Sequence, residues 1–218
     1  MNVTIEGAKA WLIKNKIEGE FNDNQMFEIR FGLENGVDVS LYADPKFDDD
    51  QMQQIRKGLE KGVDVSMYAD PKFDWEQMRG IRDGLEKGLD VTVYADPQFS
   101  EDQMFEIKKG LEKGVNVSIY ADPKFYEGQM EQIRQGLEKG VDVSIYAEPK
   151  FDEDQMNQIR RGLKEGLDVS VYADPKYNGE QMEAIKSVLR VGIDILIDEG
   201  EISLGLEGKT KPKKEKER

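Results

Sequence analysis

The chain has 218 residues, with 31 Lys and Arg against 45 Asp and Glu, so its formal net charge is −14. It contains no cysteine and no histidine, which excludes a thiol nucleophile, an imidazole base, a disulfide framework and any Cys/His site for zinc or haem. The acidic balance argues against a surface for nucleic acid or anionic membranes, and no apolar stretch approaches the roughly 20 residues that span a bilayer.

The first 21 residues precede the regular part of the chain. They lack the basic-then-apolar layout of a secretory signal. A helical stretch around residues 8–16, which includes Trp11 and Leu12, predicts that residues 1–21 form an N-terminal cap.

Residues 22–203 consist of seven tandem repeats. The dipeptide Gln-Met recurs every 26 residues without an insertion, at 25–26, 51–52, 77–78, 103–104, 129–130, 155–156 and 181–182. A fixed period of this length is the signature of a solenoid, in which neighbouring units stack to share one core. No non-repeating domain is left that would hold an active site.

Each unit begins with a helix, as the unit at 48–73 illustrates. Asp48 is a good N-cap, Gln51 at N3 completes a capping box, and Phe47 and Met52 form a hydrophobic staple across that turn. Residues that cap well fill this position at Asn22, Asp48, Asp74, Ser100, Asp152 and Asn178, and only Tyr126 departs from the pattern.

The same helix carries an apolar stripe and two glycines. Met52, Ile55 and Leu59 lie on one helical face. Gly62 is expected to end the helix as the C′ residue, and glycine recurs there at 36, 88, 114, 140, 166 and 192. Gly58 lies inside the helix at a cost of about 1 kcal/mol relative to alanine, so its recurrence indicates a close backbone approach between units.

The second half of each unit allows two interpretations. Alternation of apolar and polar residues from Val63 to Met67 fits a strand, which would give an α/β horseshoe. Alternatively Asp64 caps a short helix whose apolar face includes Val65 and Tyr68. Asp and Asn cap well and are poor strand residues, and they fill this position at Asp38, Asp64, Asp90, Asn116, Asp142, Asp168 and Asp194. The favoured fold is an all-α, elongated α-solenoid of about seven units, each a full helix plus a one-turn or 3-10 helix.

The C-terminal end departs from the repeat. The last unit keeps Asp194 but loses the sequence Tyr-Ala-Asp-Pro, as expected of a degenerate capping unit. Residues 204–218 follow as a charged tail, with six bases from Lys209 to Arg218, and this tail is expected to be disordered.

The repeated unit resembles a known kind of sequence. The pattern Tyr-Ala-Asp-Pro-Lys-Phe…Gln-Met-x-x-Ile-Arg-x-Gly-Leu-Glu-x-Gly-Val/Leu-Asp-Val-Ser is similar to tandem repeats of uncharacterised proteins from gut bacteria, their phages and conjugative elements. The similarity covers about 182 of the 218 residues. It implies no activity and no catalytic residues, and it implies a cytoplasmic location in a bacterial or phage-infected cell.

Two repeated rows of side chains are interpreted as structural. Six tyrosines at one position, and six phenylalanines with Tyr177 at another, are expected in the core rather than in a ladder for stacking ligands. A basic row is expected to pair with local carboxylates, as Arg56 would with Glu60, at Arg30, Arg56, Arg82, Lys108, Arg134, Arg160 and Lys186. Acidic clusters such as residues 44–50 lack the spacing of a calcium loop, so no metal or cofactor is expected.

Comparison between units isolates positions that the scaffold leaves free. Positions equivalent to 49, 53 and 57 lie on one helix face and differ from unit to unit. Four of the six aromatic residues outside the fixed rows fall on this variable stripe, and exposed aromatics beside mixed charges are typical of interface hot spots. The alternative is drift on a solvated face. The predicted partner-binding residues are Phe27, Phe31, Gln53, Lys57, Trp75, Arg79, Phe105, Lys109, Glu131, Asn157 and Arg161.

The sequence therefore predicts a monomeric, non-enzymatic repeat scaffold that binds a partner protein through the variable stripe. Direct binding to nucleic acid or membrane is not expected. The alternative is an acidic decoy, an anti-defence protein of a phage or mobile element that blocks a nucleic-acid-binding host factor. An enzyme is least expected, because a carboxylate pair repeated along a rod would have no pocket to raise one pKa.

Overall fold

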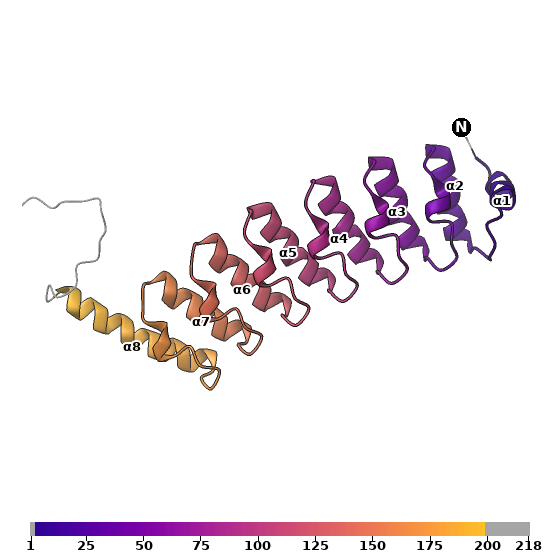
Figure 1. Cartoon of the computed structure of the whole chain (residues 1–218). Coiled ribbons are helices and arrows are strands. Elements are labelled where there is room, and N and C mark those ends of the chain that lie inside the picture. The colour runs from indigo at the N-terminus through magenta and orange to yellow at the C-terminus, as the bar shows by residue number, and fades with distance from the viewer. Residues whose placement is uncertain (1–2, 199–218) are drawn as a thin grey trace, which may run out of the picture.

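The computed structural model describes residues 3–198, and within that range all regular structure is helical. Consecutive long helices pack side by side in one row, which confirms the elongated α-solenoid (Figure 1). The long helices are α1 (Ile5–Lys14), α2 (Asp23–Asn35), α3 (Asp49–Lys61), α4 (Trp75–Glu86), α5 (Glu101–Lys113), α6 (Glu127–Glu138), α7 (Glu153–Lys164) and α8 (Gly179–Asp198).

Short 3-10 helices follow six of the long helices, so the strand interpretation of the second half-unit is wrong. They are η1 (Val39–Leu41), η2 (Val65–Met67), η3 (Val91–Val93), η4 (Val117–Ile119), η5 (Val143–Ile145) and η6 (Val169–Val171). The Asp64 carboxylate accepts the Ser66 hydroxyl at 2.6 Å and the Ser66 N–H at 3.0 Å. These two bonds favour the ionised carboxylate and therefore lower the pKa of Asp64.

The predicted capping boxes start the repeated long helices. In α3 the Asp48 carboxylate accepts the backbone N–H of Gln51 at 2.7 Å, and the Gln51 side-chain oxygen accepts the Asp48 N–H at 2.8 Å. Tyr126 supplies no side-chain cap to α6, although its N–H still donates to Gln129. Gly62 ends α3 in the left-handed conformation, with φ at 71°, as the C′ position requires.

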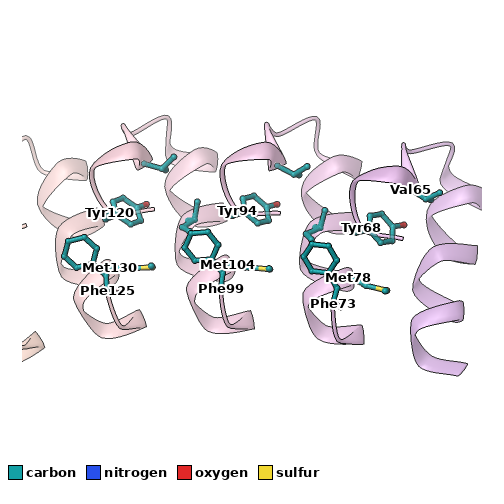
Figure 2. Close-up of a cluster of buried hydrophobic side chains, with 14 of the residues drawn as sticks. Val65, Tyr68, Phe73, Met78, Tyr94, Phe99, Met104, Tyr120, Phe125 and Met130 are labelled. Carbon is teal, nitrogen blue, oxygen red and sulfur yellow. The ribbon is translucent and has the colours of Figure 1, made fainter. Parts of the chain in front are cut away.

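The core repeats with the sequence. Figure 2 shows Tyr94, Phe99 and Met104 gathered in one step of the stack, with their equivalents arranged in the same way in the neighbouring steps. The tyrosine row is fully buried, and the phenylalanine row from 47 to 151 is buried as well. Phe21 and Tyr177, at the two ends of that row, pack on the core but stay partly exposed. The interpretation of both rows as core is confirmed.

The glycine inside each repeated helix makes room for a tyrosine of its own unit. The Tyr68 hydroxyl donates to the Gln54 carbonyl at 3.2 Å, and a β-carbon at Gly58 would lie 1.9 Å from the Tyr68 oxygen. The close approach at this glycine was predicted to be between units, and that part of the prediction is wrong. The short helix folds back across its own long helix, so the contact is to a side chain of the same unit.

Gln51 makes further hydrogen bonds that capping does not explain. It is buried, and its side-chain amide donates to the carbonyls of Pro71 at 3.3 Å and Phe73 at 2.5 Å. Those carbonyls belong to the loop that enters the next long helix. The N3 glutamines therefore tie each helix start to the next one, at Gln25, Gln51, Gln77, Gln103, Gln129 and Gln155.

The N-terminal helix covers the first repeat. It spans Ile5–Lys14 rather than residues 8–16, and Thr4 caps it by accepting the Gly7 N–H. Ala8 and Leu12 are buried against the core, and Trp11 packs there while partly exposed.

The C-terminal end of the solenoid differs more from the prediction than the N-terminal end does. Helix α8 runs unbroken to Asp198, so the expected helix end at Gly192 and cap at Asp194 are wrong. Val188 stands where the other units have the helix glycine, and Asp198 where they have the buried tyrosine. The last unit therefore lacks both halves of the contact that holds a short helix in place. Residues 199–218, which include the predicted tail, lie outside the described residues.

Alkaline pH is expected to unfold the solenoid through its buried tyrosines. Burial raises the pKa of Tyr172 to about 12, and burial likewise raises the pKa of the other five core tyrosines above the ordinary value near 10. Because the folded-state pKa is raised, the stabilisation is complete below pH 10 and is lost as pH rises above it. Phenolate absorbance from these six side chains should appear together with loss of helical circular dichroism. Full phenolate formation with an intact helical spectrum would contradict the expectation.

Candidate functional site

The variable stripe lies along the row of long helices from α2 to α8, and the eleven residues predicted to bind a partner lie on α2 to α7. The eleven predicted residues are exposed or partly exposed, and none is buried. Because these helices are neighbours in one row, the stripe is a continuous surface rather than a set of scattered positions.

The first part of the stripe is an aromatic cluster covered by arginines. Phe27 and Phe31 stack with ring centroids 5.7 Å apart and ring planes 14° from parallel. The Arg30 guanidinium lies 5.2 Å from the Phe27 centroid, and that of Arg56, on α3, lies 4.7 Å from the Phe31 centroid. The contact of Arg56 with Phe31 therefore joins α2 to α3.

Helix α3 carries polar stripe residues next to this cluster. The Lys57 ammonium donates to the Gln53 side-chain oxygen at 2.7 Å, and both residues are partly exposed. They separate the phenylalanine pair from the aromatic residues on α4 and α5.

Trp75 and Phe105 form the second aromatic part. The Arg79 guanidinium lies 5.2 Å from the Trp75 ring centroid and makes an ion pair with Glu101 on α5. The Lys109 ammonium lies 4.9 Å from the Phe105 centroid and pairs with a neighbouring carboxylate on the same helix. Both aromatic side chains thus have a cation held against them.

The stripe becomes acidic on α6 to α8. The residues at its three positions there are Glu127, Glu131, Gln135, Glu153, Asn157, Arg161, Gly179, Glu183 and Ser187, and none is aromatic. Glu131 accepts the Gln135 amide at 3.0 Å, and the Arg161 guanidinium lies 3.9 Å from Glu183. Asn157 accepts a hydrogen bond from Arg160. The surface therefore has an aromatic, cation-bearing half and an acidic half.

Exposure of the aromatic anchors agrees with prediction at two of four positions. Phe27 and Phe105 are 47% and 49% exposed. Phe31 and Trp75 are only partly exposed, so the expectation of substantial exposure is wrong for them. The guanidinium groups of Arg56 and Arg79 lie against these two rings and restrict their contact with solvent.

Five of the seven residues of the basic row pair with a local carboxylate as predicted, whereas Lys108 and Arg160 do not within the described part of the chain; some members also pair across units. Arg56 donates to Glu60 at 2.6 Å and, through Nε, to Glu28 of the preceding helix at 2.7 Å. Burial opposes the charge of Arg56, but the hydrogen bonds and attraction from the two carboxylates raise its pKa. This row is a structural brace between helices, and the cross-unit partner was not predicted.

Sequence reasoning also missed Tyr126 as an exposed residue. It lies at the start of α6, outside the stripe, and is 75% exposed. The available signal was its place in a cap position otherwise held by Asp, Asn or Ser.

The stripe is a surface of aromatic rings, cations and carboxylates. Within residues 3–198, no group of three or more acidic side chains is arranged to hold a metal ion. In the same range no helix combines the length and apolar character needed to cross a bilayer. No protein-family model matches the chain, and neither a curated protein nor a solved structure shows significant similarity to it.

Proposed function

We propose that this protein is a non-enzymatic repeat scaffold that binds a partner protein through the variable stripe. The observation that carries the proposal is the aromatic half of the stripe. Its rings are exposed or partly exposed on a continuous surface, at positions where the repeated scaffold imposes no residue. Core packing explains the other aromatic rows and does not explain this one.

The dimensions and the rigidity of this half suit a protein partner. From α2 to α5 there are three steps between neighbouring helices, each about 8–10 Å, so the aromatic half extends over about 30 Å. Cations already stacked on the rings fix the side chains before binding, which lowers the entropy cost of association.

Phe105→Ala is expected to weaken partner binding by about 2 kcal/mol, the scale of an aromatic hot spot. The folded chain should lose little stability, because the side chain is half exposed and lies outside the core. The measurement is the dissociation constant for the partner captured from bacterial host lysate, together with thermal unfolding of both forms.

Leu41→Ala is the matched control. Leu41 is 48% exposed, almost the same as Phe105, but it lies on η1 and outside the stripe. Equal losses of affinity in the two variants would refute a binding role for the stripe.

The second candidate is the acidic decoy, an anti-defence protein that blocks a nucleic-acid-binding host factor. The glutamates of α6 to α8 and the net charge of −14 favour it. A complex held by these charges should dissociate steeply as salt rises, whereas contacts anchored on aromatic rings should persist. Salt dependence of the captured complex therefore separates the two functions.

A further inference from the structure

Four members of the basic row follow a pairing rule across the helix-to-helix steps, namely Arg56, Arg134, Arg160 and Lys186. Each acceptor lies on the preceding helix, 28 residues earlier in the chain. Arg134 donates through Nε to Glu106 at 2.7 Å, as Arg56 does to Glu28. Lys186 obeys the same rule, because its ammonium bonds the Gln158 side-chain oxygen at 2.5 Å. Both a guanidinium and an ammonium thus take a partner from this position.

Arg82 and Lys108 depart from this rule. The Arg82 Nε and the side-chain oxygen of Gln54, 28 residues earlier, are both buried without a hydrogen-bond partner among the described residues. At Lys108, on α5, the acceptor itself is absent. The residue 28 positions earlier is Gly80, on α4, so the side-chain acceptor is missing. The carboxylate four residues after Lys108 is Glu112, which pairs instead with Lys87 at 2.5 Å. Within residues 3–198 the Lys108 ammonium makes no ion pair or hydrogen bond, and its ring contact is with Phe105 at 5.9 Å.

The missing side chain leaves a hollow between α4 and α5. A β-carbon at Gly80 would have no atom within 4 Å, which shows that the space is open. The hollow measures about 300 Å³ and is lined by Arg79, Gly80, Asp83, Glu101, Phe105 and Lys108. It lies within the aromatic half of the variable stripe.

Among the charged lining residues, Lys108 is the one that makes no ion pair or side-chain hydrogen bond in the described range. Glu101 is paired with Arg79, and Asp83 accepts a hydrogen bond from Arg82 at 2.9 Å. Lys108 is therefore the lining charge without a direct ion pair, since Glu112 attracts it only at longer range, and the apolar Phe105 ring forms the wall beside it.

We propose that this hollow is a docking pocket for one acidic side chain, Asp or Glu, of the protein partner. The partner's carboxylate would take the place that Glu28 and Glu106 fill at other steps, against the Lys108 ammonium. Its aliphatic stem would lie against Phe105. The inference rests on the proposed scaffold function and deepens it, because it specifies the chemistry that one site on the stripe recognises.

The test uses the full chain and a displayed library of random twelve-residue peptides. Such peptides reach about 40 Å when extended, enough to span the three steps from α2 to α5. Selection on the wild-type protein should enrich peptides with Asp or Glu at one fixed position. Absence of any enrichment, or enrichment without an acidic position, would overturn the pocket.

Gly80→Glu supplies the missing acceptor from within the chain. The new carboxylate should pair with Lys108, fill the hollow and weaken binding of the selected peptides by at least about tenfold. Gln132→Glu is the matched control, since it adds the same charge at the equivalent position facing Arg160 on α7. It should leave affinity within about twofold. Lys108→Gln, which removes the cation without adding bulk, should abolish the preference for an acidic residue.

One more variant separates failure of the pocket from failure of the proposed function. Phe27→Ala changes the stripe on α2, away from the hollow. Peptides that lose affinity with Phe27→Ala but bind Gly80→Glu like wild type would overturn the pocket and leave the scaffold function standing. Peptides that bind wild type, Phe27→Ala and Gly80→Glu equally would count against both.

Discussion

Gly84→Ala is expected to lower the free energy of unfolding by about 3 kcal/mol, although alanine inside a helix is normally better than glycine by about 1 kcal/mol. The added β-carbon would lie 2.0 Å from the Tyr94 hydroxyl and 3.0 Å from a Val91 methyl group. Tyr94 is fully buried, so its ring has no free space into which to move. Urea unfolding followed by circular dichroism measures the change.

Gly80→Ala is the matched control in the same helix. Its β-carbon would have no atom within 4 Å, so only the backbone effect operates and α4 should gain about 0.5–1 kcal/mol. Opposite signs for the two substitutions are the expected result. Destabilisation by Gly80→Ala, or stabilisation by Gly84→Ala, would show that the tyrosine contact does not control this position. Tyr94→Phe should partly rescue Gly84→Ala, because it removes the closest atom.

Gln103→Glu is expected to cost about 3 kcal/mol, even though glutamate serves as well as glutamine in a capping box. The substitution keeps the acceptor for the Ser100 N–H but removes the amide that donates to Pro123 at 3.1 Å and Phe125 at 2.6 Å. A buried carboxylate would then face two carbonyl oxygens. Thermal and urea unfolding of the full chain measure the loss.

Gln181→Glu provides the control for the capping function alone. Gln181 accepts the Asn178 N–H at the start of α8, in the same capping geometry, and it is exposed. We expect this variant to remain within about 0.5 kcal/mol of wild type. A cost equal to that of Gln103→Glu would mean that the capping box, and not the bond to the next loop, requires an amide.

Local sequence patterns predict the elements of each unit. The 26-residue period, the Asp48–Gln51 capping box and the C′ position of Gly62 could be predicted because each depends on residues within one or two turns of one another. The same holds for Asp64, which caps η2 through Ser66 two residues on. The variable stripe was also predictable, since positions four residues apart share a helix face in any α-helix.

Which residues meet between elements depends on how the helices pack on one another. The second pair of bonds made by Gln51 reaches 20 and 22 residues along the chain, and Arg56 meets Glu28 at a separation of 28. Such separations depend on the angle at which the short helix folds back and on the stagger between successive long helices. Neither quantity is contained in a local pattern of residue types.

The last unit and the hollow between α4 and α5 also separate what local sequence predicts from what packing determines. The sequence shows that Val188 replaces the helix glycine and that Asp198 replaces the core tyrosine. Only the contact of Tyr68 with Gly58 shows that these two replacements are linked. Likewise, the sequence alone does not show that Gly80 leaves out a side-chain acceptor. The pairing of Arg56 with Glu28 shows that an acceptor normally stands at this position. Local hydrogen bonds fix the units, whereas the packing of one element on another decides which of their side chains are core, brace or open surface.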